Sequence, residues 1–113
     1  MEIPKLLHYT PGETFARHFD YLDPQNPAYA QELAARGQRV QTFLVYLNDD
    51  YNGGETSFPL LEFAHRGNKG SAFLFSNIDS HGQPHEKTMH VGEAPTKGEK
   101  WVFSQWIRSF PAG

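Results

Sequence analysis

The sequence contains no cysteine, and this absence removes several kinds of site at once. Disulfide bonds, thiolate zinc sites and cysteine nucleophiles all require a thiol. Any metal that this chain binds must therefore use nitrogen and oxygen ligands, which histidine, aspartate and glutamate supply.

Long apolar runs are absent as well. A membrane-spanning helix needs about 18 or more consecutive apolar residues, and the sequence has no such run. The opening segment, MEIPKLLHYT, lacks the basic lead-in and apolar core of a signal peptide. We therefore expect neither a secretion signal nor a membrane anchor, and a cytoplasmic location is the default expectation.

Neither sign of charge predominates strongly in the sequence. Ten Lys and Arg residues stand against 13 Asp and Glu residues, which gives a net charge of -3. The chain as a whole does not attract a phosphate backbone, so nucleic acid is not an expected partner. The 113 residues fit one domain, 1–113, and the 38% of hydrophobic residues are enough for a packed core.

Short β-branched and aromatic runs, separated by Gly, Pro, Asn and Asp, dominate the sequence and predict β-strands. A short helix is expected over 28–36, between the Pro24/Pro27 pair and Gly37. So many short strands in a chain of this size favour an all-β sandwich, barrel or jelly roll with antiparallel pairing. The expected strands are 5–9, 14–19, 40–47, 56–58, 61–65, 71–76, 88–92 and 100–110.

The last of these strands has two faces of different character. One face combines charged, polar and apolar side chains and has the composition of a pocket wall; it consists of Lys100, Val102, Ser104, Trp106 and Arg108. The opposite face is apolar and continues on the strand 40–47; together the two strands contribute Phe43, Val45, Leu47, Trp101, Phe103 and Ile107. So small a chain offers little to cover this second face, so we expect a homodimer, another partner or an N-terminal segment of a longer protein to cover it.

A candidate metal-binding pair lies in His18-Phe19-Asp20. The strand period of two places the imidazole and the carboxylate on one face, about 6 to 7 Å apart along the backbone. A histidine from a distant strand, for which His90 is the candidate, would complete a two-histidine, one-carboxylate triad that leaves coordination positions open on non-haem Fe(II). Taken alone, such a pair is more often a surface histidine beside a solvated aspartate.

Seven motifs in a fixed order make the pair more specific. They are Tyr9-Thr-Pro-Gly, His18-Phe19-Asp20, the segment 42–48, the segment 53–59, the segment 69–73, His90 and the segment 98–101. In this order they resemble the C-terminal catalytic core of the prolyl 4-hydroxylase-like Fe(II)/2-oxoglutarate-dependent dioxygenases. The resemblance covers about Leu6 to Arg108. It implies a double-stranded β-helix (jelly roll) core with one short helix in a loop, without the N-terminal helices that usually cover this core in the family.

The resemblance also implies roles for individual residues. His18, Asp20 and His90 match the iron ligands, and Lys100 matches the cation that pairs with the distal carboxylate of 2-oxoglutarate. Such a carboxylate would be costly to bury without a cation. Tyr9 and Tyr46 match residues that hydrogen-bond the cosubstrate. Trp106 matches an aromatic residue that packs beside it, and Arg108 matches a residue that contacts the substrate. For these four positions, core packing or a place at the rim is the alternative interpretation.

The function that the resemblance implies is that of an oxidoreductase. We expect a dioxygenase that uses Fe(II), 2-oxoglutarate and O2, with ascorbate as the reductant, and couples oxidative decarboxylation of 2-oxoglutarate to hydroxylation of a prolyl residue in a protein. The alternative substrates are a free amino acid or another small molecule. Two other classes stay open: a cupin-like metal-binding module without catalysis, and a structural sandwich that binds no metal.

Overall fold

The computed structural model describes residues 3–109 and is built mainly from β-strands. The strands are β1 (Lys5–Tyr9), β2 (Phe15–His18), β3 (Arg39–Tyr46), β4 (Asn52–Gly53), β5 (Thr56–Phe58), β6 (Phe63–His65), β7 (Ala72–Ser76), β8 (His90–Gly92), β9 (Pro95–Lys97) and β10 (Lys100–Arg108). The prediction of an all-β fold with one short helix in a loop is confirmed.

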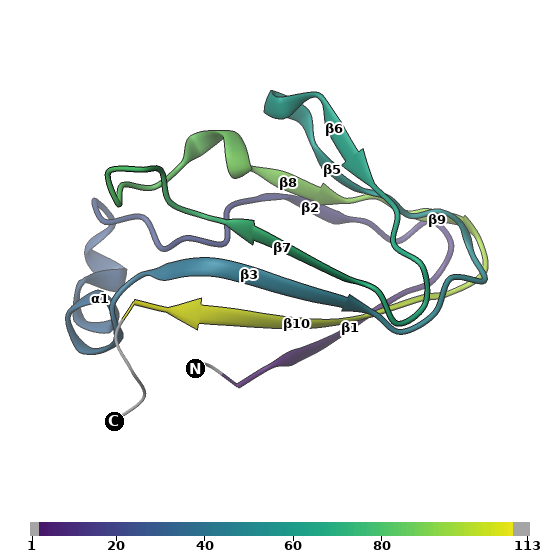
Figure 1. Cartoon of the computed structure of the whole chain (residues 1–113), viewed down its shortest axis with the longest axis horizontal. Coiled ribbons are helices and arrows are strands. Elements are labelled where there is room, and N and C mark those ends of the chain that lie inside the picture. The colour runs from purple at the N-terminus through teal and green to yellow at the C-terminus, as the bar shows by residue number, and fades with distance from the viewer. Residues whose placement is uncertain (1–2, 110–113) are drawn as a thin grey trace.

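The strands form three antiparallel sheets (Figure 1). The major sheet has the order β1-β10-β3-β7, the minor sheet has the order β2-β8-β5-β6, and β4 pairs with β9 in a small third sheet. One pocket is lined by residues of both four-stranded sheets, which places their inner faces opposite each other. This arrangement agrees with the expected jelly roll.

Helical structure among the described residues is limited to short segments. The helix α1 (Ala30–Arg36) directly follows the 3-10 turn η1 (Pro27–Tyr29), and two further 3-10 turns are η2 (Pro59–Leu61) and η3 (Glu86–Thr88). α1 ends at Gly37, whose positive φ of 75° is readily adopted by glycine. None of the described helices has the length and apolar character needed to cross a membrane.

The sequence prediction failed at the third sheet. β4 and β9 contain Asn52, Gly53 and Pro95, residue types that are depleted in strands, so no period-two pattern announces them. Residues 61 and 88 were expected to begin strands, but they lie in the 3-10 turns η2 and η3. Phe110, at the end of the expected last strand, lies outside the described residues.

β10 is the longest strand, and of its predicted pocket face Lys100, Val102, Ser104 and Trp106 line the pocket, whereas Arg108 does not. Lys100, Val102, Ser104 and Arg108 are buried, and the residues between them are partly exposed. Pairing with β1 and β3 brings Tyr9 beside Lys100 and Thr42 beside Trp106. β10 is therefore the central wall of the pocket.

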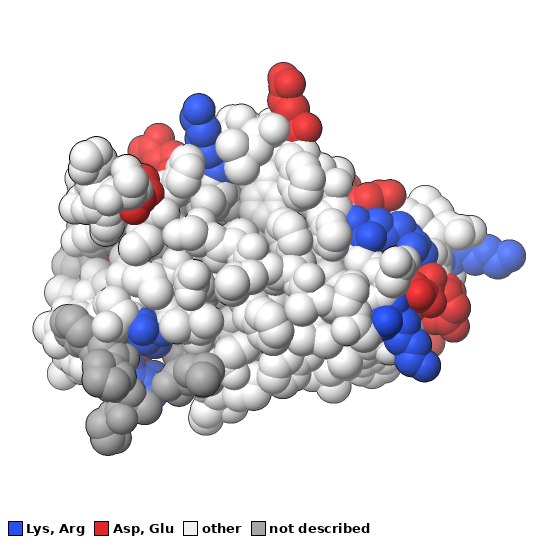
Figure 2. All heavy atoms as spheres, in the orientation of Figure 1, with Lys and Arg blue, Asp and Glu red and all other residues white. Residues whose placement is uncertain are grey.

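The outer face of the major sheet is apolar and only partly covered by the described residues. Leu6 pairs with Phe103, which in turn pairs with Val45. On the strands that flank this row, Leu74 is 52% exposed and Leu6 itself is 60% exposed. Figure 2 shows few charged side chains over the middle of the molecule, above β3, β7 and β10. The expectation of an apolar face with little covering therefore agrees with the structure.

Gly67 provides a test of the packing around Tyr46. A Cβ atom at Gly67 would lie 2.1 Å from Cδ2 of the Tyr46 ring, so Gly67→Ala should lower the free energy of unfolding by about 1–3 kcal/mol through overpacking. Thermal melting and the near-ultraviolet circular dichroism of tyrosine measure the effect. Gly70→Ala is the control, because a Cβ there meets no atom within 4 Å and carries only the cost of its positive φ. Equal melting temperatures for the two variants would contradict the close contact.

Candidate metal centre

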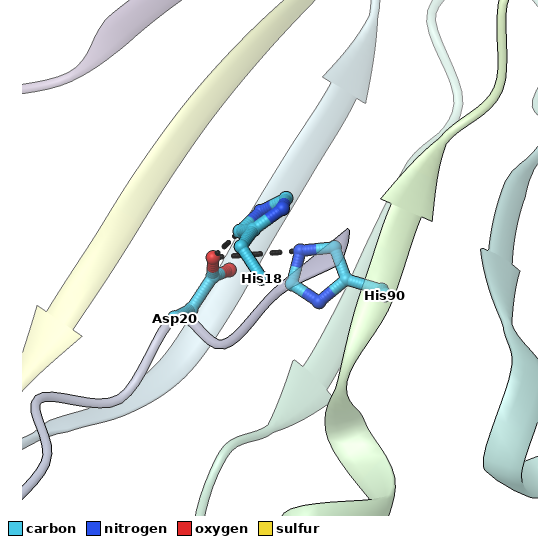
Figure 3. Close-up of side chains that lie close together, drawn as sticks. All are labelled: His18, Asp20 and His90. Atoms are coloured by element: carbon cyan, nitrogen blue, oxygen red, sulfur yellow. Dashed lines mark ion pairs between the residues drawn. The ribbon is translucent and has the colours of Figure 1, made fainter. Parts of the chain in front are cut away.

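Two histidines and one aspartate meet in the space between the two large sheets. His18 is the last residue of β2 and pairs with His90, the first residue of β8. Asp20 follows two residues after the end of β2. The ligand atoms of these three residues all lie within 4.8 Å of one another, and Figure 3 shows the side chains pointing toward a common centre. The predicted triad therefore forms in the folded chain.

The distances within the triad suit a metal ion. Oδ1 of Asp20 lies 3.3 Å from Nε2 of His18 and 3.4 Å from Nε2 of His90. Neighbouring ligand atoms of an octahedral ion with bonds of about 2.1 Å lie about 3 Å apart. Asp20 is already close to this spacing from both imidazoles, and the ligand atoms of the two histidines, which lie within 4.8 Å of each other, would approach further around such an ion.

Backbone carbonyls fix the orientation of both imidazoles. Nδ1 of His18 lies 2.8 Å from the carbonyl oxygen of Ala16, and Nδ1 of His90 lies 2.8 Å from the carbonyl oxygen of Thr88. A carbonyl only accepts, so each Nδ1 carries a proton. Each Nε2 faces Asp20: it donates to the carboxylate when the ring is protonated, and it offers its lone pair to a metal ion when that proton is lost. This is the tautomer that binds a metal through Nε2.

The charge of the centre also favours a cation. Burial raises the pKa of Asp20, but hydrogen bonds from His18, His90 and Thr42 outweigh burial and hold that pKa well below its ordinary value. Burial lowers the pKa of His18, yet its bonds to Asp20 and Ala16 leave the pKa above its ordinary value. The protein thus keeps a buried carboxylate ionised and draws positive charge toward it, which a metal ion would supply.

The triad opens into a pocket of about 300 Å³ that also contains Lys100. Lys100 is 1% exposed, and Nζ donates a hydrogen bond of 2.7 Å to the carbonyl oxygen of Gly54. Within residues 3–109, no carboxylate lies close enough to form a salt bridge with it. Burial lowers the pKa of Lys100 to about 8. A buried ammonium with this environment is suited to an anionic ligand.

Tyr9 and Tyr46 lie near the pocket in different ways. Tyr9 lines the pocket directly; burial, followed by the charges of Asp20 and Tyr46, raises its pKa to about 12, so its hydroxyl keeps its proton at neutral pH. Tyr46 is packed in the core with Leu44 and Val102. Its hydroxyl lies 3.3 Å from Oγ1 of Thr56, a residue that lines the pocket.

Trp106 and Arg108 have different positions despite sharing a face of β10. Trp106 lines the pocket, its indole Nε1 is buried without a hydrogen-bond acceptor among the described residues, and the guanidinium of Arg39 lies 3.8 Å from the centre of its ring. Arg108 is not among the residues that line the pocket. It donates to the carbonyl oxygen of Gly37 at 2.7 Å and to Glu32 at 3.2 Å. Its position therefore supports the end of α1 and offers no support for contact with a substrate in this pocket.

Several residues of the site had no predicted role. Gly54 lies in the motif 53–59 without an expected role of its own, yet its carbonyl oxygen accepts from Lys100. Thr42 donates to Asp20, and Asn77 donates to Thr42. Alternation along the strand 40–47 places Thr42 on one face with Leu44 and Tyr46, but no sequence pattern signals its contact with Asp20, a carbonyl contact or the role of Asn77.

Removal of one triad histidine tests the metal centre. His18→Ala should abolish stoichiometric binding of Mn(II), which anaerobic titration followed by electron paramagnetic resonance detects, because it removes one of three ligands. His81→Ala is the matched control, since His81 is an exposed loop residue outside the triad. Unchanged Mn(II) affinity in His18→Ala would show that the cluster is not the binding site.

Comparison with known proteins agrees with this geometry. The family model described as the 2OG-Fe(II) oxygenase superfamily matches residues 4–108. Prolyl 4-hydroxylase 1 of Arabidopsis thaliana is 34% identical over 120 residues, which cover 95% of this chain and 41% of that protein. A putative prolyl 4-hydroxylase of Acanthamoeba polyphaga mimivirus is 29% identical, with 92% of this chain and 43% of that protein covered. The chain thus spans about two fifths of the length of these relatives.

A solved structure shares both fold and sequence with this chain. The viral collagen prolyl hydroxylase of Paramecium Bursaria Chlorella virus-1 superimposes with a TM-score of 0.79 at 31% identity, covering 96% of this chain and 57% of that one. The fold is also similar to a Pseudomonas putida prolyl-4-hydroxylase, with a TM-score of 0.61 at 20% identity. From the match over residues 4–108 and the triad that those residues assemble, we conclude that this chain belongs to the 2OG-Fe(II) oxygenase superfamily and is prolyl 4-hydroxylase-like.

Proposed function

We propose that this chain is the catalytic core of an Fe(II)- and 2-oxoglutarate-dependent hydroxylase. One observation carries the proposal: the buried triad opens into the same pocket as a buried ammonium group that has no carboxylate partner among the described residues. A metal chelator with a distal carboxylate satisfies both ends of such a pocket, and 2-oxoglutarate has this form.

Each pocket residue then has a defined task. His18, Asp20 and His90 would hold Fe(II), which together with 2-oxoglutarate and O2 supplies the oxidising chemistry, with ascorbate as the proposed reductant. Lys100, whose ammonium donates to the carbonyl oxygen of Gly54, would pair with the distal carboxylate. Tyr9 keeps its hydroxyl proton and would donate a hydrogen bond to the cosubstrate. Tyr46 would act through Thr56.

Trp106 contributes a wall and a free donor to the same pocket. Its buried indole N–H has no acceptor among the described residues, so an oxygen atom of the cosubstrate or the substrate would satisfy it. The ring also helps to exclude water from the metal centre, because an oxidising site must be shielded from side reactions.

We further propose a prolyl residue in a protein as the substrate. Relatives named prolyl 4-hydroxylases support this choice, and so does the apolar character of the pocket beside the triad. Phe15 and Phe19 line the pocket and are still 43% and 42% exposed. These rings would pack against an apolar substrate such as a pyrrolidine ring, which would cover them.

The partner that covers the outer face of the major sheet belongs to the proposal as well. Leu6, Leu47 and Leu74 are more exposed than side chains of a finished core. Large exposed apolar patches usually mark interfaces. An additional segment of a longer protein or a second copy of this chain would bury them.

An assay with matched substrates tests the proposed function. With Fe(II), 2-oxoglutarate and ascorbate, a proline-rich peptide should stimulate succinate release and gain the mass of one oxygen atom, and free proline should do neither. Asp20→Ala, which loses a ligand, should give neither signal. Oxygen addition to free proline but not to the peptide would select the small-molecule alternative. Tight metal binding without succinate release would select a non-catalytic metal-binding module.

The pKa of Lys100 predicts a pH dependence of cosubstrate binding. The folded pKa of about 8 lies below the ordinary 10.5 because burial penalises the charged form. Stability should therefore rise with pH from about 8 to 10.5, since only the unfolded chain holds the proton in that window. Binding of 2-oxoglutarate requires the charged form, so its affinity in the presence of Mn(II) should fall about tenfold between about pH 7 and pH 9.

Calorimetry on two lysine variants checks the origin of this dependence. Lys100→Met should weaken 2-oxoglutarate binding and remove the fall in affinity above about pH 8. Lys97→Met, which changes an exposed lysine of β9, should leave both unchanged. A Lys100→Met variant with the pH profile of the unmodified chain would assign the titration to another group.

A further inference from the structure

We infer that Thr42 and Asn77 are positioning residues that allow only one oxygen of Asp20 to face the metal centre. This inference rests on the proposed function and goes beyond it, because neither residue belongs to the triad. The two residues form a buried chain of hydrogen bonds behind the carboxylate, here called the Asn77–Thr42 pair.

The two oxygens of Asp20 have different partners. Oδ1 faces Nε2 of His18 at 3.3 Å and Nε2 of His90 at 3.4 Å. Oδ2 accepts a hydrogen bond of 2.7 Å from Oγ1 of Thr42. Nδ2 of Asn77 in turn donates to Oγ1 of Thr42 at 2.9 Å. Oδ1 thus has the two imidazoles as partners, and Oδ2 has the hydroxyl of Thr42.

Chemistry fixes the direction of each bond in this chain. The ionised carboxylate of Asp20 can only accept, so the single hydroxyl proton of Thr42 is committed to Oδ2. The Thr42 oxygen is then an acceptor toward Asn77, which must present its amide N–H group. This orientation leaves Oδ1 of Asn77 without a partner among the described residues. The opposite orientation would set the amide oxygen against the Thr42 oxygen, two acceptors, and would lose the bond.

The backbone explains why Asp20 needs such support. Asp20 lies beyond the end of β2, so no strand pairing holds it. Thr42 is in β3, which pairs with both β10 and β7 in the major sheet. Asn77 is fixed through its backbone N–H to the carbonyl of Val40 at 2.8 Å, and its own carbonyl accepts from His85 at 3.0 Å. Exposed fractions of 4%, 1% and 0% for Asp20, Thr42 and Asn77 exclude water from the chain of bonds.

The consequence concerns the number of open positions at the metal. A carboxylate that binds through both oxygens occupies two coordination positions, and one that binds through a single oxygen occupies one. A six-coordinate ion held by three protein atoms keeps three positions for cosubstrate and O2. By holding Oδ2, the Asn77–Thr42 pair keeps Asp20 as a single-oxygen ligand and preserves the third open position.

Hydroxyl removal at Thr42 tests the role. Thr42→Val keeps the shape of the side chain and loses the donor, so the affinity for Mn(II), measured by calorimetry, should fall about 10- to 100-fold. Thr42→Ser returns a hydroxyl and should restore most of the affinity. Thr14→Val is the matched control: Thr14 donates to the carbonyl oxygen of Gly92 at 2.7 Å in the neighbouring β8 and makes no contact with Asp20. It should bind Mn(II) as the unmodified chain does.

A spectroscopic measurement separates positioning from a general loss of structure. The d–d absorption of bound Co(II) reports coordination number, and Thr42→Val should change it while Thr14→Val should not. Far-ultraviolet circular dichroism of the metal-free variants reports folding, and Asn77→Leu provides a second way to disrupt the chain of bonds if Thr42→Val does not fold. Asn77→Leu should also weaken Mn(II) binding, because it releases the Thr42 hydroxyl.

The outcomes that overturn the inference are distinct from those that overturn the proposed function. Unchanged Mn(II) affinity and Co(II) absorption in Thr42→Val, with tight binding by the unmodified chain, would overturn the inference alone. Failure of both Thr42→Val and Asn77→Leu to fold would also overturn it, since the pair would then serve the fold and not the ligand. Absence of binding by the unmodified chain would overturn both.

Discussion

The buried carboxylate of Asp20 is the constraint on which the rest of the site depends. An ionised group at 4% exposure is costly unless its surroundings compensate it. Here the compensation comes from both large sheets: His18 and His90 approach from the minor sheet, and Thr42 approaches from the major sheet. Asp20 therefore connects the two sheets, because one oxygen faces the imidazoles of the minor sheet and the other accepts from the major sheet. The geometry of the metal centre therefore depends on how the two sheets pack.

A second buried charge in the same pocket has the opposite sign and an incomplete environment. The ammonium of Lys100 has a carbonyl partner in Gly54 and the ring of Tyr9 at 4.8 Å, but neither neutralises it. A structural lysine at 1% exposure would normally have a carboxylate beside it. Lys100 lacks an anionic partner among the described residues, and the triad leaves positions open on a metal ion. One small dianion that chelates the metal would satisfy both. The cost of burying these charges is therefore consistent with ligand binding and not with stability alone.

The sequence specified the fold class, the triad and the pocket face of β10, because strand alternation and residue type carry that information. Lys100, Val102 and Ser104 alternate with outward residues as a period of two requires. Arg108 obeys the same alternation, yet it reaches Gly37 and not the pocket, because position along a strand also decides which cavity a side chain meets. The roles of Gly54 and Asn77 depend on contacts between residues 46 and 35 positions apart in the chain. Local patterns carry no record of such contacts.

Strand pairing determines which parts of the site have a fixed position. Triad, ammonium and pocket wall all lie on or beside paired strands, whose register leaves little freedom for the distances between them. Phe15 and Phe19 also line the pocket but are 43% and 42% exposed, whereas Asp20, His90 and Lys100 are buried. The residues that would hold a metal and an anionic chelator therefore lie in the more deeply buried part of the pocket. The exposed rings at the edge of the pocket are left for a further ligand to cover, so the buried residues restrict a metal and its chelator more than they restrict a substrate.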